Sequence, residues 1–123
     1  MIDFQTVNVL AVLIGGVLYM IYGAVYYSIL VGKENQETGA MKYVFSVITA
    51  FLSSFVIATL VQMTDANSLF EGAVLGGMIG LVIALVYLKN ALFGLISKKN
   101  VAIAIGDHLV IFLLLGAFHG LFT

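Results

Sequence analysis

The sequence predicts an all-α integral membrane protein, a four-helix up-down bundle, and three observations lead to this expectation. First, 63% of the 123 residues are hydrophobic and only 9% are charged, whereas soluble globular chains carry about 25% charged residues. Second, the apolar residues fall into four blocks, each long enough to cross a bilayer core of about 30 Å. Third, the connections between the blocks are short, which makes successive helices antiparallel neighbours. One transmembrane domain is therefore expected over residues 1–123.

The four helices are expected to follow one another with little chain between them. The apolar runs predict spans over roughly residues 6–31, 42–62, 70–96 and 101–122. The start of the chain carries Asp3 and no basic residue, so it does not resemble a cleavable signal peptide, and the first span should stay in the membrane. The connection before the third span holds a cluster of helix N-cap residues, Thr64, Asp65, Asn67 and Ser68. The last connection is expected to be a bare turn around Lys98, Lys99 and Asn100.

Small residues recur at every fourth position in the later spans. Lipid gives no hydrophobic drive for helix association, so small residues that let backbones approach closely have to supply the packing contacts. We expect these faces to pack inside the bundle, and an interface with a second copy or another membrane protein is the alternative. The faces are Gly72, Gly76, Gly80 and Ala84 in the third span, Gly116 and Gly120 in the fourth, and Ser46, Ala50, Ser54 and Ala58 in the second.

The first span carries a stripe of polar and small residues along its whole length. At 100° per residue its members lie within about 60° of one another. They are Asn8, Gly15, Tyr19, Tyr22, Tyr26 and Lys33. Tyr26 and Tyr27 lie near the membrane boundary, where tyrosine is a common anchor, but Tyr19 and Tyr22 fall near the middle of the membrane. Their hydroxyl groups either bond to hydroxyl residues of the second helix, among them Ser46, Thr49, Ser53 and Ser54, or line a polar path for a proton, an ion or a small solute.

Two ionisable residues lie deeper than the connections. Lys89 and Asp107 are nearly equidistant from the turn at residues 98–100, which predicts a similar depth of about 12 to 14 Å below it. Charged residues inside a span mark functional sites by default. Lys89 either pairs with Asp107 or extends along the lipid toward the headgroups. Asp107 is expected to pair with Lys89 or His108 or to line a wet cavity, and His108 either relays protons with Asp107 or is a hydrogen-bonded interior histidine.

The lysines predict how the chain is oriented in the membrane. All five flank the first and third connections, and the second connection and both ends contain none: they are Lys33, Lys42, Lys89, Lys98 and Lys99. Because cytoplasmic loops carry the excess of basic residues, these two connections should lie in the cytoplasm and both termini outside.

Several classes of function are not expected. The chain has no arginine and a net charge of −1, which argues against nucleic acid as a partner. His108 and His119 lie about 16 Å apart along one helix, too far to share a metal ion. No nucleophile with a matching base, no phosphate loop and no dinucleotide motif is present, so we expect neither an enzyme nor a cofactor.

The exit of the first span, Gly23-Ala24-Val25-Tyr26-Tyr27-Ser28-Ile29-Leu30-Val31-Gly32-Lys33, resembles a bacterial family of small membrane proteins, domain of unknown function 1761. The family pattern there is an aromatic pair, Ser-Pro, apolar residues and Gly-Lys. The resemblance continues more loosely through Glu71-Gly72, residues 90–93, and Gly106 followed by His108-Leu109-Val110. It implies a multi-pass protein of the bacterial cytoplasmic (inner) membrane without an assigned activity. Tyr26 stands where the family often has tryptophan, Ile29 where it has proline, and Asp107 where an aromatic residue is common.

Two functions follow as expectations. In the first, the bundle, alone or as a small homo-oligomer, provides a polar path for an ion, a proton or a small solute. In the second, the protein is a structural or accessory membrane subunit that acts through its helix-packing faces. A water-accessible cavity bounded by Asn8, Tyr19, Tyr22 and Tyr26 would favour the first function, and a dry stripe with paired hydroxyl groups the second.

Overall fold

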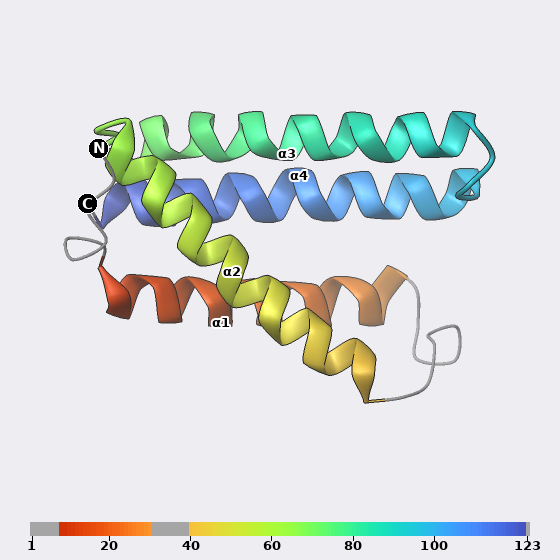
Figure 1. Ribbon diagram of the computed structural model, residues 1–123, viewed down its shortest axis with the longest axis horizontal. Helices are drawn as coiled ribbons and strands as arrows, with labels where there is room; N and C mark the ends of the chain where they lie inside the picture. Colours follow the sequence, from red (N-terminus) through yellow and green to blue (C-terminus); the bar gives the residue numbers. More distant parts are fainter. Residues whose placement is uncertain (1–7, 31–39, 123) are drawn as a thin grey trace.

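The computed structural model describes residues 8–30 and 40–122. It contains four long helices, and within these ranges there is no strand. They are α1 (Val9–Leu30), α2 (Met41–Met63), α3 (Leu69–Leu92) and α4 (Lys98–Leu121) (Figure 1). All four are long and apolar enough to cross a membrane. The predicted all-α membrane fold is therefore confirmed.

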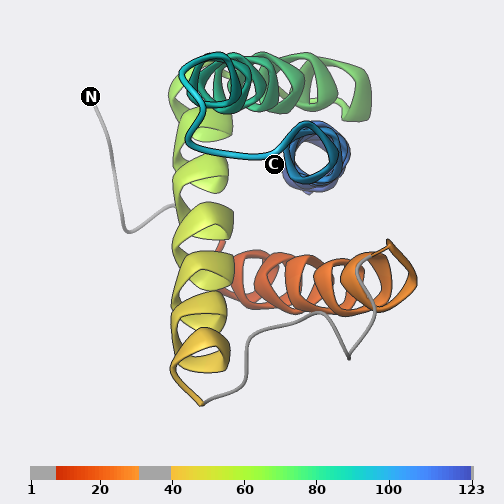
Figure 2. The same cartoon turned by 90° about the vertical axis from the view of Figure 1, so that its right-hand side faces the viewer.

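The helices alternate in direction, and α4 lies at the centre of the arrangement. In Figure 1, α4 runs between α3 and α1, and α2 crosses them obliquely. The view in Figure 2 shows that α2 covers one side of the other three helices. The end of α1, the beginning of α2 and the connection between α3 and α4 lie at one end of the molecule, which we call the lysine end (Figure 1). The beginning of α1 and the end of α4 lie at the opposite end.

The contact between α3 and α4 is made by backbone against backbone. A Cβ atom added at Gly72 would overlap the carbonyl oxygen of Gly116, and one added at Gly76 would overlap that of Phe112. At Gly120 the added atom would overlap the carbonyl oxygen of Ser68. Such close approach is what glycine permits between helices in lipid. The glycine faces of α3 and α4 therefore face each other within one chain.

The helices α1 and α2 meet across a second pair of glycines. A Cβ atom at Gly15 would overlap the Ser54 hydroxyl, and one at Gly16 would overlap the ring of Phe51. Between α2 and α4 lie the fully buried apolar side chains Ile57, Val61, Ile111 and Leu115. Most other large apolar side chains point outward along all four helices. Lipid must cover them, as expected for a multi-pass membrane protein.

The beginning of α3 agrees with the prediction, and its end does not. Ser68 is the N-cap of α3, as its sequence predicted, and its hydroxyl accepts a 3.1 Å hydrogen bond from the amide of Glu71. At the far end α3 ends at Leu92 and not at residue 96, because Gly94 turns the chain with a φ of 80°. The Ser97 hydroxyl then caps α4. The connection is therefore residues 93–97, and Lys98, Lys99 and Asn100 form the first turn of α4.

Candidate functional site

Asp107 is the one acidic side chain buried in the described part of the molecule. It lies on α4, nine residues after the helix begins at Lys98, and its side chain faces α1. With a rise of 1.5 Å per residue, this places it about 14 Å along the helix from the lysine end. Only 5% of its surface is exposed. A buried carboxyl group needs polar partners, and the residues around Asp107 supply them.

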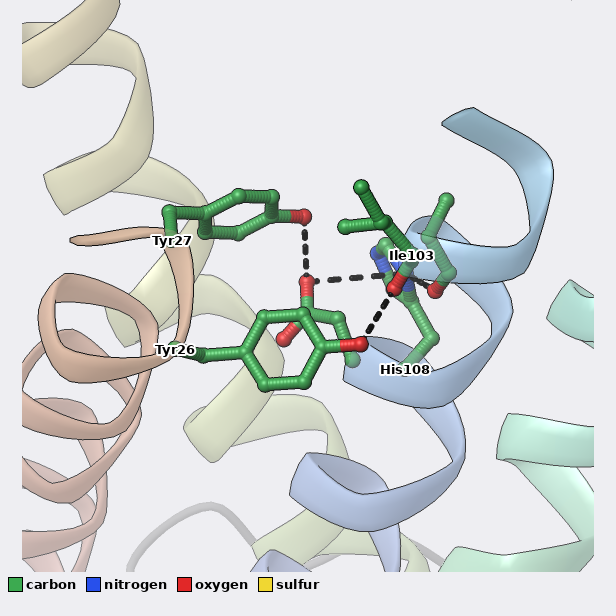
Figure 3. Close-up of polar contacts among 6 residues, drawn as sticks. Tyr26, Tyr27, Ile103 and His108 are labelled. Carbon is green, nitrogen blue, oxygen red and sulfur yellow. Dashed lines mark hydrogen bonds and ion pairs between the residues drawn. The ribbon is translucent and has the colours of Figure 1, made fainter. Parts of the chain in front are cut away.

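Tyr27 supplies the closest of these groups. Its hydroxyl donates a hydrogen bond of 2.7 Å to Asp107 Oδ2 (Figure 3). The neighbouring Tyr26 hydroxyl donates an equally short bond, 2.7 Å, to the carbonyl oxygen of Ile103. Tyr26 fits there because Gly106 has no side chain: a Cβ atom at that position would lie 2.6 Å from the Tyr26 hydroxyl. Two consecutive tyrosines of α1 thus bind α4, Tyr26 at the backbone of Ile103 and Tyr27 at Asp107 itself.

His108 lies on the other side of the carboxylate, and its surroundings identify its tautomer. Its Nδ1 is 2.8 Å from the carbonyl oxygen of Ala104 and 3.7 Å from Asp107 Oδ2. A carbonyl oxygen can only accept, so Nδ1 carries a proton and Nε2 of the neutral ring is the acceptor. The ring lies against Tyr87 of α3, with centroids 5.1 Å apart, and against Phe112. His108 therefore joins Asp107 to the third helix.

Lys89 takes no part in this cluster. The equal depth expected for Lys89 and Asp107 assumed that the third helix reaches residue 96, but α3 ends at Leu92, which puts Lys89 in its last turn. Its side chain is exposed, and among the described residues His108 is the only basic partner within ion-pair distance of Asp107. Of the partners expected for Asp107, the structure brings His108 to it and leaves Lys89 exposed in the last turn of α3.

The tyrosines of the polar stripe face α4 and not the hydroxyl residues of α2. Tyr22 stacks on Tyr26, with centroids 5.5 Å apart, and Tyr19 meets the edge of Phe112 at 6.4 Å. Asn8 caps the first turn of α1, where its Oδ1 accepts from the amide of Ala11. Lys33 lies outside the described residues. The stripe is therefore a packed contact with α4 over most of the length that the structure describes.

A second polar group lies in the opposite half of the molecule, where Ser54 of α2 meets His119 of α4. The Ser54 hydroxyl donates a 2.8 Å hydrogen bond to the carbonyl oxygen of Val12, and His119 Nε2 is 2.9 Å from the same hydroxyl. A hydroxyl has one proton, and this one is bound to Val12, so His119 Nε2 must be the donor. Ser54 and His119 are both buried, 0% and 3% exposed. The two histidines therefore have opposite tautomers.

An apolar layer separates the two polar groups. Asp107 and His119 are twelve residues apart on α4, about 18 Å along the helix axis. The side chains between them include Ile111, Phe112 and Leu115, which are 0%, 7% and 0% exposed and pack on Ile57 of α2. In this conformation the interior is therefore closed between the two halves of the membrane.

A pocket of about 460 Å³ opens at the end of the molecule opposite the lysines. The start of α1, the end of α2, the connection to α3 and the end of α4 form its walls. Asn8 and His119 line it, but none of the stripe tyrosines does. Within residues 8–30 and 40–122, no three histidine, aspartate or glutamate side chains come close enough together to bind a metal ion.

Two of these contacts are not predicted by the sequence. The position of Tyr27 predicts an anchor at the membrane boundary, yet Tyr27 is the hydroxyl donor of Asp107. The sequence predicts Ser54 as part of a packing face and as a possible partner of the stripe tyrosines, yet Ser54 binds His119. The sequence carries a signal for the contact between Tyr27 and Asp107, since a hydroxyl group and an acid inside an apolar chain both need polar partners. No spacing in the sequence points to the contact between Ser54 and His119.

Comparison with known protein families gives a match over most of the chain. The model of the family described as "Protein of unknown function (DUF1761)" matches residues 10–120. No curated protein and no solved structure matches the chain.

Proposed function

The chain belongs to the DUF1761 family of proteins of unknown function, and from its interior we propose that it moves protons across the membrane, with Asp107 as the proton-binding group. The observation that supports this is the environment of Asp107: a carboxylate that is 5% exposed inside a membrane helix, with a tyrosine hydroxyl at 2.7 Å and an imidazole nitrogen at 3.7 Å. Acids in such positions are costly and characterise proton and ion pathways.

The partners of Asp107 suit a proton better than a fixed charge. A structural ion pair would place a lysine or arginine against the carboxylate, but the chain has no arginine and Lys89 is directed outward. Tyr27 is a neutral donor and His108 carries a charge only when it is protonated. Among the described residues, the charge of Asp107 can therefore be neutralised only by a proton on the pair itself.

His108 is placed to exchange that proton. Its Nδ1 proton is bound to the Ala104 carbonyl oxygen 2.8 Å away and lies near Asp107 Oδ2, 3.7 Å from Nδ1, while its Nε2 is the acceptor atom of the ring. Proton uptake at Nε2 and release from Nδ1 to the carboxylate would leave both groups neutral. The separation of 3.7 Å exceeds a hydrogen bond, so the transfer needs a small rotation of the ring or one bridging water.

Protonation also affects how α1 is held. The contact between α3 and α4 at the glycine faces is made by backbone atoms, which carry no group that takes up a proton. The contact between α1 and α4 near the lysine end instead includes the bond from Tyr27 to Asp107, which weakens when the acceptor loses its charge. The apolar layer at Ile111 and Leu115 blocks passage in the present conformation. We propose that movement of α1 relative to the α3–α4 pair opens the interior to one side at a time.

Proton flux into vesicles tests this function. The protein is reconstituted with an internal pH-sensitive dye, and a potassium gradient with valinomycin sets the membrane potential. Wild type should acidify the lumen faster than empty vesicles, Asp107→Asn should reduce the flux to the empty-vesicle rate, and Lys89→Gln should not. Equal flux through wild type and Asp107→Asn would exclude Asp107 as the proton-binding group.

The structural or accessory subunit remains the second candidate, and a separate observation favours it. The hydroxyl groups of Tyr26 and Tyr27 are both paired, as they would be in a dry interior that only fixes helix register. The glycine faces cannot provide the partner surface, because α3 and α4 use them against each other. Loss of stability in Asp107→Asn, without any flux in wild type, would favour this role. For either function we propose a non-enzymatic protein of the bacterial inner membrane, with its lysine end in the cytoplasm.

A further inference from the structure

His108 is the more accessible member of the pair that it forms with Asp107. Its side chain is 16% exposed, and that of Asp107 is 7% exposed. Asp107 Oδ2 also accepts the hydrogen bond from Tyr27, whereas no residue within 8–30 and 40–122 donates a hydrogen bond to His108 Nε2. On the proposed route, a proton therefore meets the imidazole before it meets the carboxylate.

Proton uptake in this order creates a charged ring inside the membrane. A proton bound at Nε2 converts neutral His108 to an imidazolium, which lasts until Nδ1 passes its own proton to the Asp107 carboxylate and both groups are neutral. A cation inside lipid is costly unless other groups stabilise it. Asp107, at 3.7 Å, is the only acidic partner within ion-pair distance of His108 among the described residues. Further stabilisation of the imidazolium must therefore come from uncharged groups.

The aromatic ring of Tyr87 on α3 is such a group. Its centroid lies 5.1 Å from that of the His108 ring, and the two planes are inclined by 38°, far from a perpendicular, edge-to-face arrangement. A cation within about 6 Å of an aromatic centroid is attracted by the electrons of the ring face. Phe112 stacks on the imidazole as well, but its centroid is 6.3 Å away, beyond that distance. Tyr87 is therefore the aromatic neighbour within range of a protonated His108.

The close contact between α3 and α4 brings the two rings together. A Cβ atom at Gly80 would lie 3.0 Å from the carbonyl oxygen of His108, so the two backbones approach closely at that level. Tyr87 follows Gly80 by seven residues, which at 100° per residue returns to the same face of α3 within about 20°. Aromatic side chains of a helix point back toward its N-terminus. For Tyr87 this direction leads toward the level of Gly80 and His108.

We infer that Tyr87 is a positioning residue for proton uptake, because its ring stabilises the protonated state of His108 through a cation–π contact from α3. This role rests on the proposed proton transfer between His108 and Asp107, in which Tyr87 itself exchanges no proton. The contact also gives α3 an interaction with α4 that strengthens when a proton binds. The backbone contacts at the glycine faces carry no group that takes up a proton.

Stepwise fluorination of the ring at position 87 tests the contact, because fluorine withdraws electrons from the ring face and changes its shape little. The full chain in lipid nanodiscs carries Tyr87→Phe, or phenylalanine analogues with one, two or three ring fluorine atoms at the same position. Nitrogen-15 NMR measures the ratio of protonated to neutral His108 at the pH where the two forms are equal in wild type. Tyr87→Phe should keep this ratio, and each fluorine atom should lower it. Three fluorine atoms, or Tyr87→Leu, should lower it about threefold.

The other titratable groups near His108 stay unchanged through this series. They are Asp107 on its own helix and Tyr19 and Tyr27 on α1. His119 is an internal control, because it lies in the opposite half of the molecule and its signals should not change. Tyr43→Leu is the matched control for Tyr87→Leu, since Tyr43 is 64% exposed on α2. In the vesicle assay, Tyr87→Leu should lower the proton flux about threefold, and Tyr87→Phe should not.

Two results would overturn this role of Tyr87. One is a protonated fraction of His108 that does not fall as fluorine atoms are added, because the electrons of the ring then have no effect on the charge. The other is an equal loss in Tyr87→Phe and Tyr87→Leu, which would assign the effect to the hydroxyl group. The proposed function fails separately: equal flux through wild type and Asp107→Asn excludes proton transfer at Asp107, while the fluorine series still decides whether Tyr87 acts on His108.

Discussion

Tyr27 and Asp107 join the first and last helices of the protein, and their oxygen atoms lie 2.7 Å apart. The bond connects the last turn of α1 with the interior part of α4, across 80 residues of sequence. Through this hydrogen bond the protonation of Asp107 affects how α1 is held against α4. Its contribution to stability can be measured directly.

Tyr27→Phe should lower the free energy of unfolding by about 1 kcal/mol, since interhelical hydrogen bonds in membrane proteins average about 0.6 kcal/mol and a charged acceptor strengthens them. In the Asp107→Asn background the same change should cost less, because the two side chains act as a pair. Unfolding in mixed micelles with increasing dodecyl sulfate measures both. Tyr43→Phe is the control, because Tyr43 is 64% exposed on α2. Identical losses for Tyr27→Phe and Tyr43→Phe would show that the bond adds no stability.

Gly76→Ala should destabilise the protein by about 1 to 3 kcal/mol, the usual cost of overpacking a tight contact. The added methyl group would overlap the carbonyl oxygen of Phe112, which is backbone and cannot move aside. Gly77 is its matched control on the same helix, because a Cβ atom there would meet only Leu113 Cδ1 at 3.7 Å. Gly77→Ala should be neutral or stabilise by up to about 1 kcal/mol through helix propensity. Equal effects at both positions would contradict the backbone contact between α3 and α4.

The two histidines should show opposite tautomers. Nitrogen-15 NMR of the histidine-labelled protein in nanodiscs should find the proton of His108 on Nδ1 and that of His119 on Nε2, because of their partners Ala104 and Ser54. His108→Phe assigns the signals. Ser54→Ala should change the His119 signals and leave those of His108 as they were. The same tautomer at both sites would contradict the hydrogen bonds described above.

The chain contains no cysteine, so single thiols can report its orientation. Asn67→Cys lies in the connection between α2 and α3, Lys99→Cys lies in the first turn of α4, and both positions are exposed. The positive-inside rule predicts that a membrane-impermeant maleimide labels Asn67→Cys in intact cells and Lys99→Cys only after the membrane is opened. The reverse pattern would place the lysine end outside. Labelling of both thiols in intact cells would indicate two orientations.

The sequence was sufficient to predict the helices and their number. Apolar blocks of more than twenty residues have few alternatives to a membrane helix, because every backbone polar group must be paired inside lipid. The end of α3 was less certain from sequence, since Phe93, Leu95 and Ile96 are as apolar as the helix before them. Hydrophobicity does not distinguish a helix from a turn there. The left-handed backbone of Gly94 does, and glycine permits this conformation without requiring it.

Contacts between helices were harder to predict because they depend on tilt and stagger. Counting residues from a turn compares depths only when helices are parallel and end at the same level. Counting in this way offers Lys89 as one partner for Asp107, although Lys89 lies three residues before the end of α3, and it does not point to Tyr27. The oblique course of α2 (Figure 1) similarly brings Ser54 to His119, although the two residues lie at different distances from the ends of their helices.

The glycine contact between α3 and α4 also bears on how the protein is made. Of the four helices, α4 is the last to leave the ribosome, and it carries the one acid buried in the described interior. Its neighbour α3 precedes it by a connection of only five residues, 93–97, so the two can associate as soon as both are in the bilayer. By then Tyr27 has already been inserted with α1. The carboxyl group of Asp107 therefore enters lipid with a backbone partner beside its helix and its hydroxyl donor already in place, which shortens the time it spends unpaired during biogenesis.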